Sequence, residues 1–317
     1  MPAPDGQPTA APAVPPAAIK DDFYRFVLSA AGGGTDELST LEHGNLKQLE
    51  LLSTRFDIRS LPRLPTVLPQ LLRALKADRA GGGELARLIG RDPLMVGEVM
   101  RVTNSAHYRL AQPVSSLQHA VVLLGQEGLH RVLTQHAMKP ILQSSGGAFG
   151  QAAGERLWQH AERCAHACAW LGRHNGCDAF EAYLAGIVCH AGDGAVVRLL
   201  DHLKLQASEA PSIPFLAACA DLASRLSSQV AKYWELPRRV VHAVSERQQH
   251  ATPATSPLGK ALAVADLLAM AHLLVENRLF EQSPDFSSSW PGLFTPNLLA
   301  RCQQDLLRHF PVEPTAA

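Results

Sequence analysis

Residues 91–105 read RDPLMVGEVMRVTNS, and this stretch decides the fold. Asp92 can cap a helix, and Pro93 then occupies the first helical position, where its missing N–H costs nothing. The side chains that follow at helical spacing share one face: Met95, Val96, Val99, Met100 and Thr103. The pattern predicts a short helix that has one buried face and ends at Asn104-Ser105.

A second helix is predicted directly downstream. Ser115 and Gln118 have the spacing of a capping box ahead of an apolar run, and Gly125 is expected to end the helix. Almost every periodic segment from residue 65 onward is helical, and no convincing alternation of period two is present. The sequence therefore predicts an all-α fold.

These motifs resemble the HDOD family, a helical signalling module distantly related to the HD phosphohydrolases. The matching residues are the LPxLP of 61–65, the RDP of 91–93, the NSAxY of 104–108, the PVxSLxxAV of 113–121 and the LG of 124–125. A weaker likeness extends to about residue 250. The resemblance implies a two-lobed helical bundle with an HD-like second lobe, and a signalling role rather than a catalytic one.

Composition and helix pattern divide the chain into four parts. The first is rich in Pro and Ala and cannot bury enough apolar surface to order itself, so we predict a disordered tail. The parts are the tail (1–19), two N-terminal helices (20–57), the HDOD-like domain (58–250) and a C-terminal helical extension (251–317). Within the domain, the SSGG of 144–147 separates lobes at about 58–143 and 153–250.

The overall charge limits the kinds of partner. With 29 basic and 29 acidic residues the net charge is zero, which argues against a binder of nucleic acid or anionic membranes that depends on electrostatics. The chain has six cysteines and no secretory signal pattern, so we expect reduced thiols and a cytoplasmic location. The apolar stretch of 261–275 is too short to span a bilayer, and no membrane association is expected.

The resemblance to HD enzymes marks three candidate metal-site residues. Those enzymes hold one or two metal ions with a first His, a His-Asp doublet and a distant Asp, and the metal activates a water that attacks a phosphoester. Matching the helix patterns places His160 at the first His, Cys189-His190-Ala191 at the doublet and Asp266 at the distant Asp. The doublet reads His190-Ala191 in one register and Cys189-His190 in the other, and both lack its carboxylate.

The candidate metal set is therefore predicted to be degenerate. His160, His190 and Asp266 could still form a three-ligand site, and Asp193 could reach the same space if the helix continued that far. The family's His pair, which follows a Trp-x-Leu-Pro corner, corresponds to Glu246-Arg247 in this chain. Because ligands are lost rather than gained, we expect no metal, no cofactor and no catalysis, and the three residues hydrogen-bonded within a core.

Two cysteine chemistries are weaker alternatives. His160, Cys164 and Cys168 share a helical face, but a structural zinc site needs four converging ligands and the chain has no Cys-x-x-Cys pair. Cys164 and Cys168 alternate with alanines, which favours small core fillers in a tightly packed helix. Cys189 and His190 are adjacent, and adjacent residues of one helix point apart, so we expect no nucleophile–base pair.

A polar and aromatic cluster follows the helix predicted after Asp92. Its members are Arg101, Asn104, Ser105, His107, Tyr108 and Arg109. The cluster is either a satisfied helix end or a recognition edge for a partner or ligand. The connection to the next helix is too long for a helix-turn-helix, so nucleic-acid binding is not favoured.

Three functional hypotheses remain open. The leading one is a non-catalytic regulatory module that binds a signalling protein or a small ligand, as the resemblance implies. The second is a metal-dependent phosphohydrolase that uses His160, His190 and Asp266. The third is a regulator associated with nucleic acid.

Overall fold

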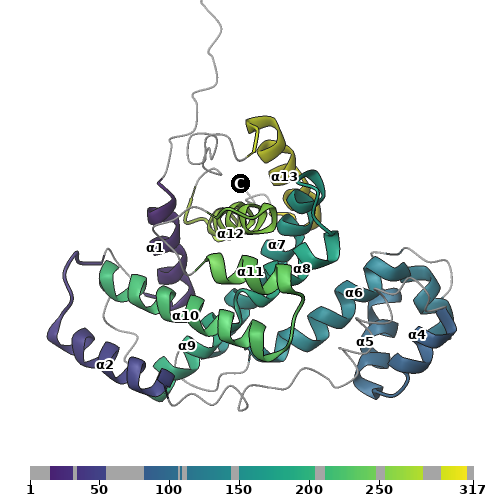
Figure 1. Ribbon diagram of the computed structural model, residues 1–317, viewed down its shortest axis with the longest axis horizontal. Coiled ribbons are helices and arrows are strands. Elements are labelled where there is room, and N and C mark those ends of the chain that lie inside the picture. The colour runs from purple at the N-terminus through teal and green to yellow at the C-terminus, as the bar shows by residue number, and fades with distance from the viewer. Residues whose placement is uncertain are drawn as a thin grey trace, which may run out of the picture.

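The computed structural model describes residues 15–30, 34–54, 82–105, 108, 113–143, 150–203, 211–247, 254–280 and 294–312. These segments contain helices and no strand, so the predicted all-α fold is confirmed (Figure 1). The helices are α1 (Pro16–Val27), α2 (Thr40–Thr54), α4 (Gly82–Ile89), α5 (Pro93–Thr103), α6 (Leu117–Gln143), α7 (Gly150–His174), α8 (Ala179–Val188), α9 (Ala191–His202), α10 (Ile213–Tyr233), α11 (Arg238–Glu246), α12 (Pro257–Glu276) and α13 (Pro296–His309).

The first lobe consists of α4, α5 and the N-terminal part of α6. Asp92 caps α5 as predicted, because its Oδ1 accepts hydrogen bonds from the backbone N–H groups of Leu94 at 2.9 Å and Met95 at 3.3 Å. Met95 and Val99 are fully buried in the small core of this lobe. The helical dihedrals of α6 are interrupted at Gly125, where φ is 62° and ψ is −176°. This confirms the predicted end of the helix, since a positive φ favours glycine.

The start of α6 differs from the prediction by one residue. The helix begins at Leu117, and the hydroxyl of Ser116 accepts a hydrogen bond from the backbone N–H of His119 at 3.2 Å. The predicted capping box of Ser115 with Gln118 is therefore wrong. Both serines satisfy the local preference for a cap, and the sequence pattern alone could not choose between them.

The second lobe has a larger core and is built around α7. This helix packs against α8 and α12, and α10 packs against α9. The α7–α8 contact is close, because a Cβ atom on Gly186 would lie 2.6 Å from the Cα of Ala165. Cys164 and Cys168 are completely buried at this crowded part of α7, as expected for small core fillers.

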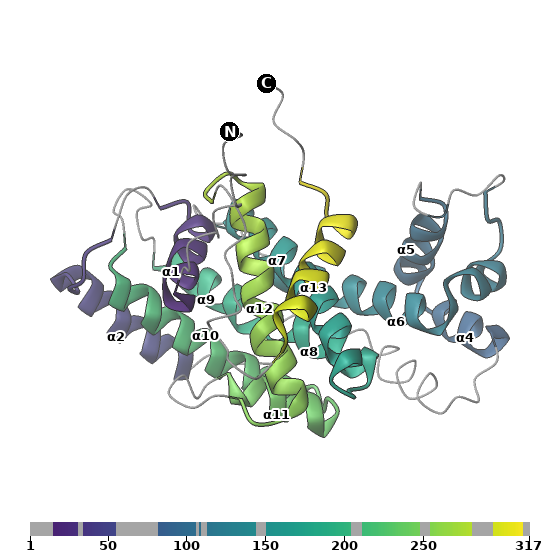
Figure 2. The same ribbon diagram turned by 90° about the horizontal axis from the view of Figure 1, so that it is seen from above.

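The long helix α6 joins the two lobes. Its C-terminal residues Met138, Ile141 and Leu142 belong to the core of the second lobe, whereas Leu129 and Leu133 belong to the core of the first. Figure 2 shows α6 running from the main body of the molecule towards α4 and α5 at one end. Helix α6 therefore forms part of both cores and connects the two lobes.

The N-terminal helices pack on the second lobe. Helix α1 contacts α12, and Ile19 and Phe23 are buried in the large core. Because α1 begins at Pro16, the predicted tail of 1–19 extends too far; its remaining part, 1–14, lies outside the described residues. A cap shared by Ser39 and Glu42 precedes α2, each side chain accepting a hydrogen bond from the backbone N–H of the other.

The C-terminal segment is more than an extension. Helix α12 lies at the centre of the second lobe against α7, α1 and α11, and α13 covers the end of α7. By length and composition, Ala179–His202 and Pro257–Glu276 could cross a membrane, but 94% and 83% of their most apolar windows are buried inside the protein. Both segments are core helices of the second lobe.

Candidate functional site

The three predicted metal-site residues meet in the core of the second lobe. His160 lies on α7, Asp266 lies on α12, and His190 lies between α8 and α9. The Nε2 of His160 is 3.3 Å from the Oδ1 of Asp266, and the Nε2 of His190 is 3.6 Å from the same oxygen. The two imidazole rings are edge-on with centroids 4.3 Å apart. All three residues are buried.

Asp193 joins this cluster, as considered from the sequence. The Nδ1 of His190 lies 3.2 Å from the Oδ2 of Asp193, and the hydroxyl of Tyr24 donates a hydrogen bond to Oδ1 at 3.0 Å. The preceding helix does not continue to Asp193: α8 ends at Val188, and a new helix, α9, begins at Ala191 and brings Asp193 to the cluster in its first turn. Gly192 allows α9 to pack directly on α10. A Cβ atom at Gly192 would lie 1.9 Å from the carbonyl oxygen of Ala223.

An arginine that the sequence had not marked as a site residue completes the cluster. One terminal nitrogen of the Arg247 guanidinium donates to the Oδ2 of Asp266 at 2.8 Å, and the other donates to the carbonyl oxygen of Cys189 at 2.7 Å. Arg247 follows the end of α11, at the position assigned to the family's His pair. Its neighbour Glu246 binds elsewhere, accepting hydrogen bonds from the backbone N–H groups of Thr255 and Ser256 at 3.0 Å each.

Burial and neighbouring charges shift the pKa values of the cluster. Burial works against an ionised Asp266, but the Arg247 guanidinium and the two histidines hold the pKa of Asp266 well below its usual range. Burial lowers the pKa of His160, so this imidazole is neutral. For His190, burial is outweighed by the Cys189 sulfur and the carboxylates of Asp193 and Asp266, which raise its pKa. Although burial works against an ionised Cys189, a hydrogen bond from Cys164 and the side chains of His190 and Arg247 in turn lower the pKa of Cys189.

Cysteine chemistry at this place differs in geometry from the expectation. Cys189 and His190 lie in the turn between α8 and α9 instead of in one helix, so their side chains do not point apart. Potential ligand atoms of Cys164, Cys189 and His190 all lie within 4.8 Å of one another. The Cys189 thiol donates to the Gly186 carbonyl oxygen at 3.2 Å, and both thiols are fully buried. Three such ligands are one fewer than a tetrahedral structural zinc site uses.

The polar and aromatic cluster predicted after α5, here called the polar edge, contains residues with a structural role and residues that line a pocket. Asn104 is structural: its side-chain nitrogen donates to the Val114 carbonyl oxygen at 3.1 Å, and its Oδ1 accepts from the Val114 N–H at 2.7 Å. The guanidinium of Arg101 pairs with Glu98 on the exposed side of α5. His107 and Arg109 lie outside the described residues. Ser105 and Tyr108 line a pocket between the lobes.

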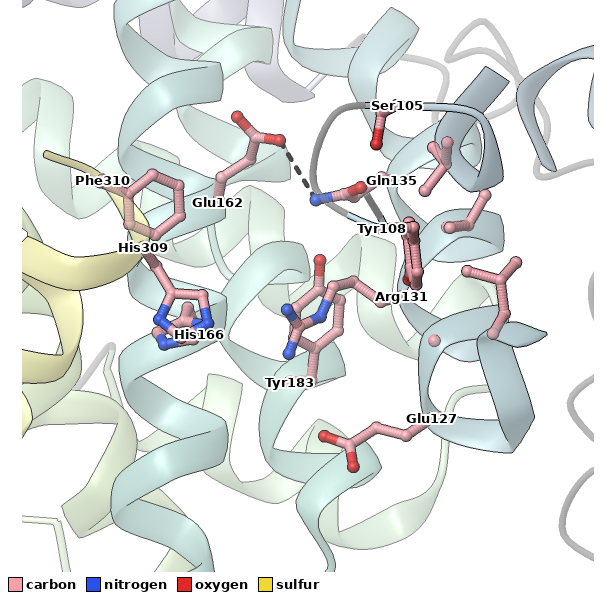
Figure 3. Close-up of a pocket in the computed structure, with 14 residues that line it drawn as sticks. Ser105, Tyr108, Glu127, Arg131, Gln135, Glu162, His166, Tyr183, His309 and Phe310 are labelled. Atoms are coloured by element: carbon pink, nitrogen blue, oxygen red, sulfur yellow. Dashed lines mark hydrogen bonds between the residues drawn. The ribbon is translucent and has the colours of Figure 1, made fainter. Parts of the chain in front are cut away.

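This pocket has a volume of about 430 Å³ and is separate from the His–Asp cluster. Figure 3 shows Arg131 and Tyr183 near its centre, Ser105 and Tyr108 on one side, and His309 and Phe310 on the other. The lining residues are Val102, Ser105, Tyr108, Leu124, Glu127, Gly128, Arg131, Val132, Gln135, Glu162, His166, Tyr183, His309 and Phe310. Its walls therefore come from both lobes, on α5, α6, α7 and α8, and from the end of α13.

The fold and the buried cluster define a helical protein of the HD type. The HDOD domain family model matches residues 61–250, and the chain belongs to that family. A protein of unknown function from Treponema pallidum is 22% identical over 313 residues, which cover 94% of this chain but only 59% of that protein.

Solved structures share the fold. An HDOD domain protein of unknown function from Geobacter sulfurreducens is 19% identical with a TM-score of 0.55, over 85% of this chain and 99% of that one. A protein from Marinobacter aquaeolei VT8, provisionally named a signal transduction protein, is 20% identical with a TM-score of 0.57, over 92% of this chain and 64% of that one. A protein from Shewanella amazonensis SB2B, provisionally named a metal-dependent phosphohydrolase, is 18% identical with a TM-score of 0.51, over 83% of this chain and 98% of that one.

Proposed function

We propose that the chain is a non-catalytic regulatory module of signal transduction, which acts in the cytoplasm by binding a protein partner or a small ligand. The observation that carries the proposal is the guanidinium of Arg247 in the His–Asp cluster. It already pairs with the Oδ2 of Asp266, whose carboxylate is the strongest candidate ligand that remains from the HD set. A signalling name among the relatives of the same fold is consistent with such a role.

The residues of the cluster do not fit a catalytic metal centre. Hard divalent cations need anionic oxygen ligands, and neither register of the doublet, His190-Ala191 or Cys189-His190, supplies its carboxylate. Asp266 is paired with Arg247, and Asp193 is hydrogen-bonded to His190 and Tyr24. A metal ion would enter beside a fixed guanidinium and compete with it for the same carboxylate.

A metal-dependent phosphohydrolase remains the second candidate because of one specific observation. Ligand atoms of His160, His190 and Asp266 lie within 4.8 Å of one another. In addition, the His190 Nε2 and the Asp266 Oδ1 are buried without a hydrogen-bond partner among the described residues. The His190 Nε2 and the Asp266 Oδ1 are 3.6 Å apart, so an ion pair between a protonated His190 and Asp266 stabilises both groups without a metal ion.

An assay of phosphoester hydrolysis distinguishes the regulatory module from the phosphohydrolase. The full chain is assayed on a panel of phosphomonoesters, phosphodiesters and cyclic nucleotides, with Mn²⁺, Fe²⁺ or Zn²⁺ added. We expect no hydrolysis above that of a His190→Ala variant. Hydrolysis that requires the added metal and is abolished by His190→Ala would overturn the proposal.

A nucleic-acid role has no specific support among the described residues. The net charge of the chain is zero, and Arg101, a basic residue of the polar edge, is paired with Glu98. We therefore expect no salt-dependent shift of DNA or RNA by the full chain. Such a shift at physiological salt would favour the third hypothesis over a protein or small-molecule partner.

A further inference from the structure

The pocket between the lobes has the features of a ligand site. Its volume of about 430 Å³ lies within the range of small-molecule sites, and its walls combine apolar, aromatic and a few polar side chains. It shares no residue with the His–Asp cluster. Whatever binds in it therefore does not depend on the old HD centre.

Arg131 supplies a cation that forms no ion pair with a carboxylate of the described residues. Its Nε is buried without a hydrogen-bond partner among the described residues, and its guanidinium lies over the ring of Tyr183, 5.6 Å from the centroid. Neither of the two carboxyl groups in the lining pairs with Arg131. Glu127 pairs with Arg173, and Glu162 accepts a hydrogen bond from Gln135 at 3.2 Å (Figure 3). The pocket thus presents to a bound molecule a guanidinium that forms no ion pair with the described residues.

Tyr183 supplies a second donor beside that charge. The residue is 5% exposed, and its buried hydroxyl donates to no acceptor among the described residues, while the side-chain amide of Gln135 approaches the phenol oxygen. Burial raises the pKa of this phenol above its usual value, so the group is an O–H donor at neutral pH. A buried donor without a partner is costly, and an acceptor on a ligand would satisfy it. Arg131 and Tyr183 together suit one anionic group.

Aromatic side chains border the pocket on both sides. Tyr108 comes from the first lobe, whereas His309 and Phe310 come from the end of α13 (Figure 3). His166 adds a neutral imidazole, because burial lowers its pKa to about 4. Flat ligands are held by such side chains through ring stacking.

From this arrangement we propose that the pocket binds a small organic anion that carries a flat ring, with its acid group on Arg131 and Tyr183 and its ring between the two lobes. The inference rests on the proposed regulatory function and specifies its ligand. Since the walls come from both lobes, binding favours one arrangement of the lobes over others. A change of concentration of the anion is thereby converted into a change of shape that a partner protein can detect.

The test is a calorimetric titration of the full chain with defined probes. Guanosine 5′-monophosphate and 4-hydroxybenzoate represent phosphate-ester and carboxylate sources of the same chemistry, and guanosine and inorganic phosphate each lack one half of it. We expect one of the two ring-bearing anions to bind, and the uncharged nucleoside and the inorganic ion to bind at least about tenfold more weakly.

Variants tie the binding to the pocket. Arg131→Gln is expected to weaken binding by about tenfold or more, and Tyr183→Phe by several-fold. Arg225→Gln is the matched control, because it removes the same charge from an exposed ion pair with Glu50 on the far side of the second lobe. The dissociation constant of Arg225→Gln for the ring-bearing anion should remain within about twofold of that of the wild type. Thermal unfolding of each variant verifies that it is folded.

Three outcomes would overturn the pocket assignment. These are no binding of either anion, binding of phosphate as tight as that of the ring-bearing anions, or equal binding by the wild type and Arg131→Gln. None of them bears on catalysis, which is judged by the phosphoester assay. Failure of the ligand assignment is therefore distinguishable from failure of the proposed non-catalytic function.

Discussion

At the scale of single residues, the chemistry of the second lobe depends on a few substitutions in an HD-like cluster. Neither register of the doublet, His190-Ala191 or Cys189-His190, contains its carboxylate, and Arg247 donates to Asp266 from the position assigned to the family's His pair. The cluster keeps two histidines and a carboxylate, and Arg247 pairs with that carboxylate. Under the proposed non-catalytic function, these buried residues serve the packing of the second lobe.

Removing the guanidinium should destabilise the fold. In Arg247→Met, Asp266 stays buried without its ion-pair partner, and we expect the free energy of unfolding to fall by about 3–5 kcal/mol. Urea denaturation followed by circular dichroism measures this. Arg225→Met, which removes one partner of an exposed pair, should cost about 0–1 kcal/mol. Equal effects of the two variants would contradict the role assigned to Arg247.

The same pair predicts the response to acid. The pKa of Asp266 is lowered in the folded protein, so its contribution to stability is present above its usual value of 3.8 and is lost as the pH falls through the folded value. Without Arg247 the pKa of Asp266 rises, and we expect acid unfolding of Arg247→Met to begin at a higher pH than in wild type. An unchanged acid midpoint, measured by tryptophan fluorescence, would argue against the pairing.

The contribution of Glu162 to folding stability depends on pH in the opposite direction to that of Asp266. Burial raises its pKa from 4.5 to about 7 in the folded protein. The groups that act on it are Gln135, Lys139, Arg163, Glu155 and Arg101. Its contribution is fully present below pH 4.5 and is lost as the pH rises through about 7. We expect Glu162→Gln to gain about 2 kcal/mol relative to wild type between pH 5 and pH 8. Parallel stability curves for the two proteins would refute this.

At the scale of the element, small residues decide how closely the helices of the second lobe approach. Gly186 lets α8 lie against the backbone of α7, and Gly192 does the same for α9 against α10. These contacts place His160 and His190 with their rings 4.3 Å apart. Close helix packing is therefore what brings residues distant in sequence into one cluster.

A matched pair of glycines tests this packing. Gly186→Ala would put a methyl group 2.6 Å from the Ala165 Cα and should cost about 1–3 kcal/mol. Gly97, inside α5, has no atom within 4 Å of an added Cβ, so Gly97→Ala should stabilise by about 0.5–1 kcal/mol. Denaturant titration of both variants measures the difference. Destabilisation by both would mean that loss of glycine, not crowding of α7, is responsible.

Sequence patterns within a few residues predicted where helices begin and end, but they predicted less well which side chains of different helices meet. Asp92, Pro93 and Gly125 mark helix ends in the sequence because caps and breaks depend on neighbouring residues. His160, His190 and Asp266 were predicted from the spacing of helices in a resembling family, and they do meet.

Other features could not be predicted from local pattern. Whether an arginine side chain at the end of α11 turns outward or into the core depends on contacts with α8 and α12. Tyr24 reaches Asp193 across 169 positions of sequence for the same reason. The pocket needs Tyr108, Arg131 and Phe310 from three separate segments, and only their packing creates it.

At the scale of the whole molecule, two lobes of unequal size are joined by one long helix. The smaller lobe has its own core, and the larger one holds the His–Asp cluster, the N-terminal helices and α12. The pocket lies where the lobes meet, on the side of α6 that faces α13. This arrangement suits a protein in which ligand binding between the lobes changes their relative positions. The buried His–Asp cluster then stabilises the second lobe.

The most direct test of the central claim is the metal content of the purified full chain. The protein is incubated with Mn²⁺, Fe²⁺ or Zn²⁺, dialysed, and analysed for metal per chain, with Arg247→His and His190→Ala treated in parallel. If the Arg247 guanidinium takes the place of a metal ion, the wild type retains far less than one equivalent, and Arg247→His retains more. One equivalent of metal held by the wild type and lost in His190→Ala would contradict the account.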